Sequence, residues 1–470
     1  MLPLLSYKLY RYKKDMMMKQ DNKLKTSNGM NNQSHAMNQR RKNKNPSLTE
    51  ITILLFGMFG VPVFYFCYWT LISIYHWTIA FNTEQLLSAP PKSVSMDTAF
   101  NPFYFNPLSI SIKEIIENRL VNMKKYKFNY SWTDIDRRGD LSIEEYRDIY
   151  SGKWPVIITD CGIKWPAMKK WTKSYFMKSH GRELVTVKTM ADGVSENFAM
   201  PLDIYMQHLH KGYPKQWTYL NDELFIPSRP KLQSDLGTCK EIMEDYFQMF
   251  PVEIRPWWSF LLWGTRYSRS HLHMDPYNWT GTNMVISGLK QWKLFPPGQD
   301  NLLHVKLETK YKFPININKY NSKIDCFDPN AHIEYPSLKS AKVLEFYQYP
   351  GELLIIPTGW FHQAFNEEIT LAVAGQLMNS ENYLYVLEEI FKGGDLQRGP
   401  YYSDLKNKSP QEKVKEVLLG ITEKTRTQGR EATEFIYNQL KQLAESSGLP
   451  VPPSILDLIN SQKHKTDNLP

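Results

Sequence analysis

The feature that most constrains this chain is an uncharged apolar run from Ile51 to Phe81. The run contains no Asp, Glu, Lys or Arg, and it exceeds the roughly 20 apolar residues that a helix needs to cross a bilayer. The apolar part of a secretory signal is only about 7–15 residues long, so the run does not match one. A buried helix of a soluble protein is the alternative interpretation. We expect residues 51–81 to form one transmembrane helix, in which Pro62 can introduce a kink.

Basic residues gather before this run. Residues 1–50 hold eleven Lys or Arg against three acidic residues, so most of the net charge of +9 lies there. We expect this segment to be a disordered basic tail. The rest of the chain is almost neutral, which argues against nucleic acid as a partner of the folded part. The positive-inside rule then predicts a single-pass membrane protein with a cytoplasmic N-terminus and a large domain in the lumen of the endoplasmic reticulum or Golgi.

After the run, the composition changes three times. Residues 82–131 resemble a Pro-punctuated stalk that leads into an amphipathic helix. Residues 132–380 hold short apolar strands with Gly or Pro turns, for example at 154–161, 183–190 and 257–264, which is typical of a β-sandwich or barrel. Cys161, Cys239 and Cys326 show no recognisable spacing, so the sequence leaves open whether any of them form a disulfide.

The sequence predicts helices in residues 381–470. Ser409-Pro410-Gln411-Glu412 is a capping box, and a second helix ends before Gly448. The apolar residues of the two helices fall on one face each: Val414, Val417, Leu418 and Ile421, then Ala432, Phe435, Ile436, Leu440 and Leu443. Such faces pack on the domain or form a homodimer, and we favour packing.

A partial calcium-loop spacing occurs between Asp134 and Glu145. Asp134 and Asp136 fit the spacing, but Arg138 occupies the third ligand position and would place a cation beside a cation. We therefore expect the end of a strand followed by a helix that Ser142 caps.

The residues that indicate chemistry lie in two segments. His273 and Asp275 are two residues apart, so on a strand their side chains project from one face. His362 follows an apolar strand and a Pro-Thr-Gly turn in GELLIIPTGWFH, residues 351–362. Two imidazoles and one carboxylate suit iron(II) and leave coordination positions open for substrates. A His-x-Asp pair alone is a weak signal, but its combination with Lys290 and the second segment is strong.

With these segments the chain resembles the JmjC (cupin-like) family of iron(II)- and 2-oxoglutarate-dependent oxygenases. The resemblance covers residues 132–380, and it includes the stretches at 136–161, 165–181 and 219–225. It is strongest to the small hydroxylases, which include JmjC lysyl hydroxylases and the asparaginyl hydroxylase of the hypoxia factor. The fold implied is mainly β with flanking helices (α+β), a double-stranded β-helix or jelly roll, here preceded by one transmembrane helix.

The resemblance also implies roles for individual residues. His273, Asp275 and His362 would hold the iron, and Lys290 would bind the distal carboxylate of 2-oxoglutarate. Further cosubstrate contacts are implied for Asn283, Ser270 and Tyr219. Ser270 stands where a Thr is usual, and Ala374 stands where some relatives carry a hydroxyl group.

Other histidines and aromatic residues have simpler interpretations. His271 shares a strand face with His273, and we expect it to line the pocket rather than to bind metal. The remaining histidines of interest should lie on the surface or in loops: His208, His210, His304 and His332. Trp292, Trp360 and Phe361 should form the core or the pocket wall.

The function expected is a membrane-anchored oxygenase that uses iron(II), 2-oxoglutarate and O2 to hydroxylate a side chain of a protein. Demethylation of histone or other N-methyl groups uses the same chemistry, but the membrane span would separate the domain from chromatin. A cupin that binds metal without catalysis would be expected to lack a ligand or Lys290, and all are present. A metal-binding cupin with a different chemistry would use His271 and His273 together as ligands. Such a site would need a Glu a few residues later as a further ligand, and none follows.

Overall fold

The computed structural model describes residues 134–257, 259–312, 316–393 and 408–454, all within the unit Leu86–Pro470. The expected tail, membrane span, stalk and lead-in helix, which together cover residues 1–131, lie outside the described residues. In the described part of the chain, no helix is long and apolar enough to cross a membrane.

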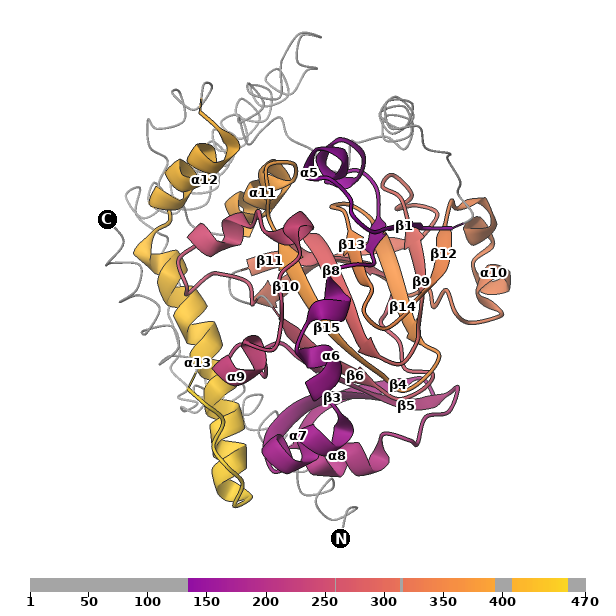
Figure 1. The fold of residues 1–470 in the computed structure, drawn as a ribbon, viewed down its shortest axis with the longest axis vertical. Helices are drawn as coiled ribbons and strands as arrows, with labels where there is room; N and C mark the ends of the chain where they lie inside the picture. Colours follow the sequence, from indigo (N-terminus) through magenta and orange to yellow (C-terminus); the bar gives the residue numbers. More distant parts are fainter. Residues whose placement is uncertain (1–133, 258, 313–315, 394–407, 455–470) are drawn as a thin grey trace, which may run out of the picture. The chain divides into compact units, whose positions relative to one another are not determined.

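Two sheets make up the centre of the described part (Figure 1). The larger sheet has the order β1 (Asp136–Arg138), β2 (Val156–Ile158), β13 (Leu353–Ile356), β8 (Thr280–Ser287), β15 (Thr370–Leu377), β6 (Phe260–Gly264), β5 (Gln216–Asp222), β3 (Leu184–Ala191) and β4 (Val194–Pro201). The smaller sheet has the order β10 (Val305–Lys312), β11 (Asn316–Ser322), β7 (His273–Met274), β14 (Phe361–Asn366), β9 (Lys290–Phe295) and β12 (Leu344–Gln348).

The chain passes back and forth between these sheets. β8 belongs to the larger sheet and β9 to the smaller, and the alternation repeats at β13, β14 and β15. Pairing within each sheet is antiparallel except between β1 and β2. The result is a jelly roll with flanking helices, as the sequence predicted, and it confirms the expected β-rich fold class.

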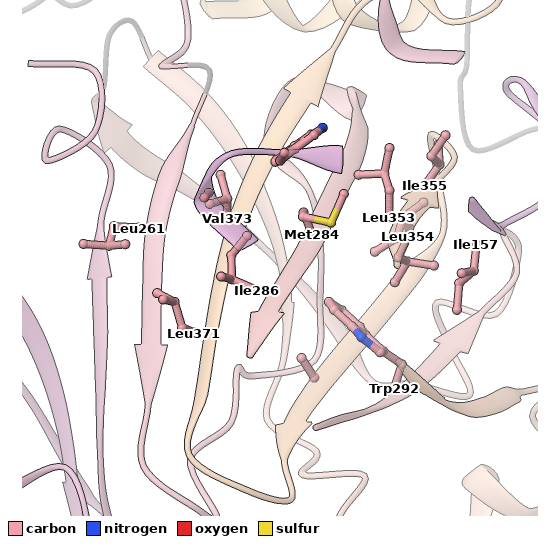
Figure 2. Close-up of a cluster of buried hydrophobic side chains, with 14 of the residues drawn as sticks. Ile157, Leu261, Met284, Ile286, Trp292, Leu353, Leu354, Ile355, Leu371 and Val373 are labelled. Atoms are coloured by element: carbon pink, nitrogen blue, oxygen red, sulfur yellow. The ribbon is translucent and has the colours of Figure 1, made fainter. Parts of the chain in front are cut away.

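The core explains why β13 is apolar at every position. All four of its residues, Leu353–Ile356, are buried, because β2 and β8 pair with its two edges and other residues cover both of its faces. Figure 2 shows this cluster, in which Leu353, Leu354 and Ile355 lie near Met284 of β8 and Trp292 of β9. The same core therefore joins strands of both sheets.

The expected strands are present, and two of the three are shorter than the expected segments. The segments at 154–161 and 257–264 contain β2 and β6, and the segment at 183–190 coincides with β3 to within one residue. The helices around the sheets are α5 (Ile143–Glu145), α6 (Ala167–Lys170), α7 (Lys173–His180), α8 (Leu202–His208), α9 (Pro230–Gln233), α10 (Ala331–Glu334) and α11 (Tyr383–Gly393). A π-helical turn, Tyr146–Tyr150, follows α5 directly.

The partial calcium loop is the end of a strand and the start of a helix, as expected. Ser142 caps α5 by accepting a hydrogen bond from the backbone N–H of Glu145 at 3.1 Å. The guanidinium group of Arg138 pairs with the carboxylate of Glu145 at 3.0 Å. Arg138 therefore engages the carboxylate that the spacing would assign to calcium.

The C-terminal helices pack on the domain. The helix α12 (Pro410–Leu419) begins with the predicted capping box, and α13 (Glu423–Ser446) ends before Gly448. The apolar face of α12 joins a buried cluster with Phe247, Trp279 and α11. On α13, Ala432 and Ile436 pack against a second cluster, whereas the predicted face residue Phe435 is 63% exposed. Packing on the domain is thus confirmed, and a homodimer stays a prediction.

A disulfide joins Cys161 and Cys239, whose Cα atoms lie 5.5 Å apart, and Cys326 is a buried free thiol. The sequence left this pairing open because the two cysteines are 78 residues apart and follow no local motif. Cys161 follows β2, and Cys239 precedes a short 3-10 helix, Lys240–Ile242. The bond therefore ties together two irregular segments beside the larger sheet.

Candidate active site

The two histidines of the predicted triad face each other across a strand pair. His273 on β7 and His362 on β14 are direct partners in the antiparallel register, and their ring centroids lie 4.4 Å apart. Asp275 was predicted to share the strand with His273, but β7 ends at Met274, and Asp275 directly precedes the 3-10 turn Pro276–Asn278. Pro276 explains the early end, because proline has no N–H to continue the strand pairing.

Backbone carbonyl groups fix the orientation of both imidazole rings. Nδ1 of His273 lies 2.8 Å from the carbonyl oxygen of His271, and Nδ1 of His362 lies 3.1 Å from that of Trp360. Each Nδ1–H therefore donates to a carbonyl group, which leaves Nε2 as the atom with a lone pair. Both Nε2 atoms lie 3.6 Å from Oδ1 of Asp275. The donor atoms of all three residues lie within 4.8 Å of one another.

The protonation states suit metal binding. Burial lowers the pKa of His362 to about 4 despite the nearby carboxylate, so its imidazole is neutral at pH 7. Burial alone would raise the pKa of Asp275, but the adjacent His362 and His273 lower it overall. A metal ion requires neutral imidazoles and an ionised carboxylate. Two nitrogen donors and one anionic oxygen on one side are the donor set that suits iron(II).

Lys290 lines the same cavity. Its side chain is 1% exposed, and Nζ donates a hydrogen bond to the hydroxyl group of Tyr219 at 3.3 Å. Nζ also lies 5.4 Å from the ring centroid of Trp292. Among the residues that the structure describes, no carboxylate lies within ion-pair distance of Nζ. Burial accordingly lowers the pKa of Lys290 to about 7. A buried cation without an anion is unfavourable, so this position suits a carboxylate ligand.

The other predicted cosubstrate contacts lie around the same space. Asn283 is buried, and its side-chain Oδ1 has no hydrogen-bond partner among the described residues. The hydroxyl oxygen of Ser270 accepts a hydrogen bond from the backbone N–H of Ala364 at 3.0 Å, which leaves its O–H to donate. Ala374 also lines the cavity, and it faces Asn283 in the strand register.

The cavity that these residues line has a volume of about 240 Å³ and lies between the two sheets. The larger sheet contributes Tyr219, Asn283 and Ala374, and the smaller sheet contributes the histidines of the triad and Lys290. The structure thus brings all seven predicted site residues together: His273, Asp275, His362, Lys290, Asn283, Ser270 and Tyr219.

The histidines and aromatic residues outside the triad lie largely where the sequence placed them. His271 lines the cavity, and its Nε2 lies 2.9 Å from Oδ1 of Asn321. Trp292, Trp360 and Phe361 are buried. His210, His304 and His332 are exposed, and His208 is half-buried at the end of α8.

A comparison with known families agrees with this site. Residues 142–375, about half of the chain, match the family model of the cupin-like domain. This part of the chain is a cupin-like domain. All three residues of the triad, and the four predicted cosubstrate contacts, lie within the matched range.

Relatives of the cupin-like domain have named activities. The chain is 28% identical to the bifunctional arginine demethylase and lysyl-hydroxylase psr-1 of Caenorhabditis elegans over 54% of this chain and 63% of that protein. It is 25% identical to the 2-oxoglutarate and iron-dependent oxygenase JMJD4 of Danio rerio over 39% of this chain and 43% of that protein. It is 26% identical to the bifunctional peptidase and (3S)-lysyl hydroxylase JMJD7 of Homo sapiens over 48% of this chain and 78% of that protein.

These relatives and the triad together identify the cupin-like domain as one of the JmjC, 2-oxoglutarate- and iron-dependent oxygenase type. The chain spans less than two thirds of the length of several of the curated relatives that it matches, for example 63% of psr-1.

Several cavity residues were missed by the sequence interpretation. Asn221 on β5 and Glu223 directly after β5 line the cavity on one side, and Lys319 and Asn321 line it from β11. The alternation Tyr219-x-Asn221-x-Glu223 could have indicated the first pair, since a strand that exposes Tyr219 to the cavity also exposes every second residue. For Lys319 and Asn321 the sequence holds no comparable signal, because β11 reaches the cavity only by pairing with β7.

Proposed function

We propose that the protein hydroxylates a side chain of a protein substrate, using iron(II), 2-oxoglutarate and O2. The observation that carries the proposal is the convergence of His273, Asp275 and His362 on one point, next to the buried Lys290. Bound iron would supply the activation of O2. The residues of this chain would hold the metal on three sides, pair with the distal carboxylate of 2-oxoglutarate through Lys290, and exclude water from the cavity.

A succinate-release assay tests this proposal. We expect the full chain, purified in detergent with iron(II) and 2-oxoglutarate, to form succinate, and we expect His273→Ala, Asp275→Ala and His362→Ala each to abolish this turnover while the domain stays folded. With one ligand removed, the metal is held weakly and its geometry is undefined. Full turnover by Asp275→Ala combined with loss in His271→Ala would show that the ligand assignment is wrong.

Lys290→Ala separates cosubstrate binding from metal binding. We expect it to raise the 2-oxoglutarate requirement tenfold or more, because a charge-assisted contact in a dry pocket contributes about 1.5–3 kcal/mol. The iron requirement should change much less. An unchanged 2-oxoglutarate requirement would move the anchor to another residue.

Demethylation is the second candidate, because psr-1 is named as an arginine demethylase as well as a lysyl hydroxylase. Mass spectrometry of the product distinguishes the two reactions. Hydroxylation adds one oxygen atom to the substrate, whereas demethylation removes a methyl group as formaldehyde. A protein that binds iron and forms no succinate with any substrate would instead be a non-enzymatic cupin.

We also propose that residues 51–81 anchor the protein in a membrane and that the domain faces the lumen. The charge difference across the apolar run supports this orientation. The disulfide between Cys161 and Cys239 supports it independently, because disulfides persist in oxidising compartments such as the endoplasmic reticulum.

A further inference from the structure

The cavity contains a carboxylate that neither the metal nor the cosubstrate would use. Tyr219, Asn221 and Glu223 alternate along β5 and its continuation, so their side chains share one face, and all three line the cavity. Tyr219 is hydrogen-bonded to Lys290 and so marks the cosubstrate end of this row. Glu223 lies at the other end.

The strand register gives the position of Glu223 across the sheet as well. Asn283 on β8 faces Ala374 on β15, and Ala374 faces Phe260 on β6. Because Asp222 pairs with Leu261, the next residue, Glu223, falls opposite Phe260. Glu223 is therefore three strand spacings away from Asn283, on the order of 14 Å measured across the strands of the sheet. The carboxylate of Glu223 is thus well separated from the cosubstrate contacts.

The surroundings of Glu223 favour a bound cation. The side chain is half-buried beside the apolar cavity residues Trp257 and Phe260. Within the described ranges, no hydrogen bond or ion pair of its carboxylate is found. Burial raises the pKa of Glu223, the charge of Lys319 on β11 opposes that rise, and the neighbouring Asp222 adds to it. A cation that approaches a desolvated carboxylate of this kind stabilises its ionised form.

We propose that Glu223 binds the charged head of a Lys or Arg residue of the protein substrate, and that this residue is the one oxidised. The inference rests on the proposed function. Lys and Arg combine a charged head with a long apolar stem, which matches a carboxylate next to Trp257 and Phe260.

The proposal assigns hydroxylation rather than demethylation to this site. With its head bound at Glu223, the substrate side chain would present carbon atoms of its stem to the metal ligands in the same cavity, rather than an N-methyl group. The reaction is then hydroxylation of a C–H bond. One atom of O2 enters that bond as a hydroxyl group, and 2-oxoglutarate loses CO2 and takes up the other atom to become succinate.

Peptides that differ only in charge test the proposal. The full chain in detergent is assayed for peptide-stimulated succinate release with degenerate peptides that carry Lys, acetyl-lysine, Arg, Asn, Asp or Leu at the centre. We expect Lys or Arg peptides to exceed the acetyl-lysine peptides about tenfold or more, the effect of one charge-assisted contact. Glu223→Gln should reduce this ratio to near one, and Glu223→Asp should restore part of it.

Glu196→Gln is the matched control, since Glu196 is an exposed carboxylate on β4 outside the cavity, and it should keep the wild-type ratio. Thermal unfolding of each variant excludes a general loss of folding. Equal rates with Lys and acetyl-lysine peptides in the wild type, or an unchanged ratio in a folded Glu223→Gln, would overturn the proposal. Removal of methyl groups from methyl-lysine peptides without a hydroxylated stem would overturn the assigned orientation.

Failure of this inference differs from failure of the proposed function. Triad-dependent succinate release with neutral or acidic peptides alone would keep the hydroxylase function and remove the role of Glu223. No triad-dependent release with any peptide or with 2-oxoglutarate alone would remove both.

Discussion

Asp275 can reach the two histidines because the residue facing it, Gly281, has no side chain. A Cβ atom on Gly281 would lie 2.2 Å from Oδ2 of Asp275, a distance that no real contact tolerates. Gly281 also faces Ile356 in the strand register, so β8 cannot move away without loss of its pairing with β13. Its small size therefore positions a metal ligand.

We predict that Gly281→Ala weakens metal binding by about 10- to 100-fold, the range typical of residues that orient metal ligands. The methyl group would push the carboxylate of Asp275 out of the triad. The measurement is the affinity for Mn²⁺ or Co²⁺ by calorimetry, without turnover. Ser287→Ala, on the exposed end of the same strand, serves as the control. Wild-type metal affinity in Gly281→Ala would contradict the positioning role.

The lowered pKa of Lys290 leads to a prediction of how 2-oxoglutarate binding depends on pH. Its pKa is about 7 in the free protein because of burial, and a bound carboxylate would raise that value. Binding of 2-oxoglutarate should therefore take up a proton, and the affinity should fall as the pH rises above about 7, by up to about tenfold per pH unit. Titration of the Mn²⁺-loaded protein with 2-oxoglutarate between about pH 6.5 and 8.5 measures this.

The matched variant for this prediction is Lys290→Arg. Arginine stays protonated over the whole range, so any binding that Lys290→Arg retains should not vary with pH. An equally steep pH dependence in Lys290→Arg would assign the proton to another group.

The sequence could predict the residues of the candidate site but not the features that position them. His273, Asp275, His362 and Lys290 could be found because their types and spacings are visible along the chain. Gly281 could not be found, because its importance depends on the close approach of Asp275 from a separate segment. Glu223 could have been found only through its alternation with Tyr219. Pro276 did hold a signal that β7 would stop before Asp275, and the prediction that both residues share a strand overlooked it.

At the scale of elements, α13 is attached to the domain by a close backbone contact. A Cβ atom on Gly429 would lie 2.1 Å from the carbonyl oxygen of Glu253. The next residue, Arg430, pairs with the buried carboxylate of Glu253 at 3.2 Å. The buried face of α13 was predicted from the spacing of its apolar residues. That spacing does not take Gly429 into account, so the contact of Gly429 with Glu253 was missed. Phe435, which the periodicity included, is exposed for this reason: the helix docks through Gly429 and Arg430 as well as through Ile436.

We predict that Gly429→Ala lowers the free energy of unfolding by about 1–3 kcal/mol, although alanine favours a helix more than glycine does. The reason is that the methyl group separates α13 from Glu253. Thermal or denaturant unfolding gives the measurement. Glu431→Ala, an exposed position on the same helix, should change stability little. A more stable Gly429→Ala protein would mean that α13 is not held by this contact.

At the scale of the whole molecule, the orientation in the membrane can be tested with glycosylation sites. We predict glycan on Asn129 or Asn407 and none on Asn32, if the domain is lumenal as proposed; all three lie outside the described residues. Asn278 should stay unmodified in either orientation, because its side chain is 2% exposed. An endoglycosidase mobility shift that disappears in Asn129→Gln or Asn407→Gln measures this.

Protease protection of sealed membranes supplies the control for that prediction. The domain should resist digestion until detergent is added. Glycan on Asn32, or digestion without detergent, would place the domain in the cytoplasm, where the disulfide between Cys161 and Cys239 would not be expected to persist. Cytosolic or nuclear substrates would then have to be considered again.

The place of β13 between β2 and β8 has a consequence for synthesis of the protein. Val156–Ile158 leaves the ribosome long before Leu353–Ile356, so β2 has no neighbour on that edge until most of the chain has been made. Unpaired strand edges of this kind invite association with other chains, and folding that depends on distant segments is slow. A nascent chain should therefore need chaperones until β13 emerges. A product that ends before Leu353 would lack both the strand that joins β2 to β8 and His362, so it would be degraded rather than partly active.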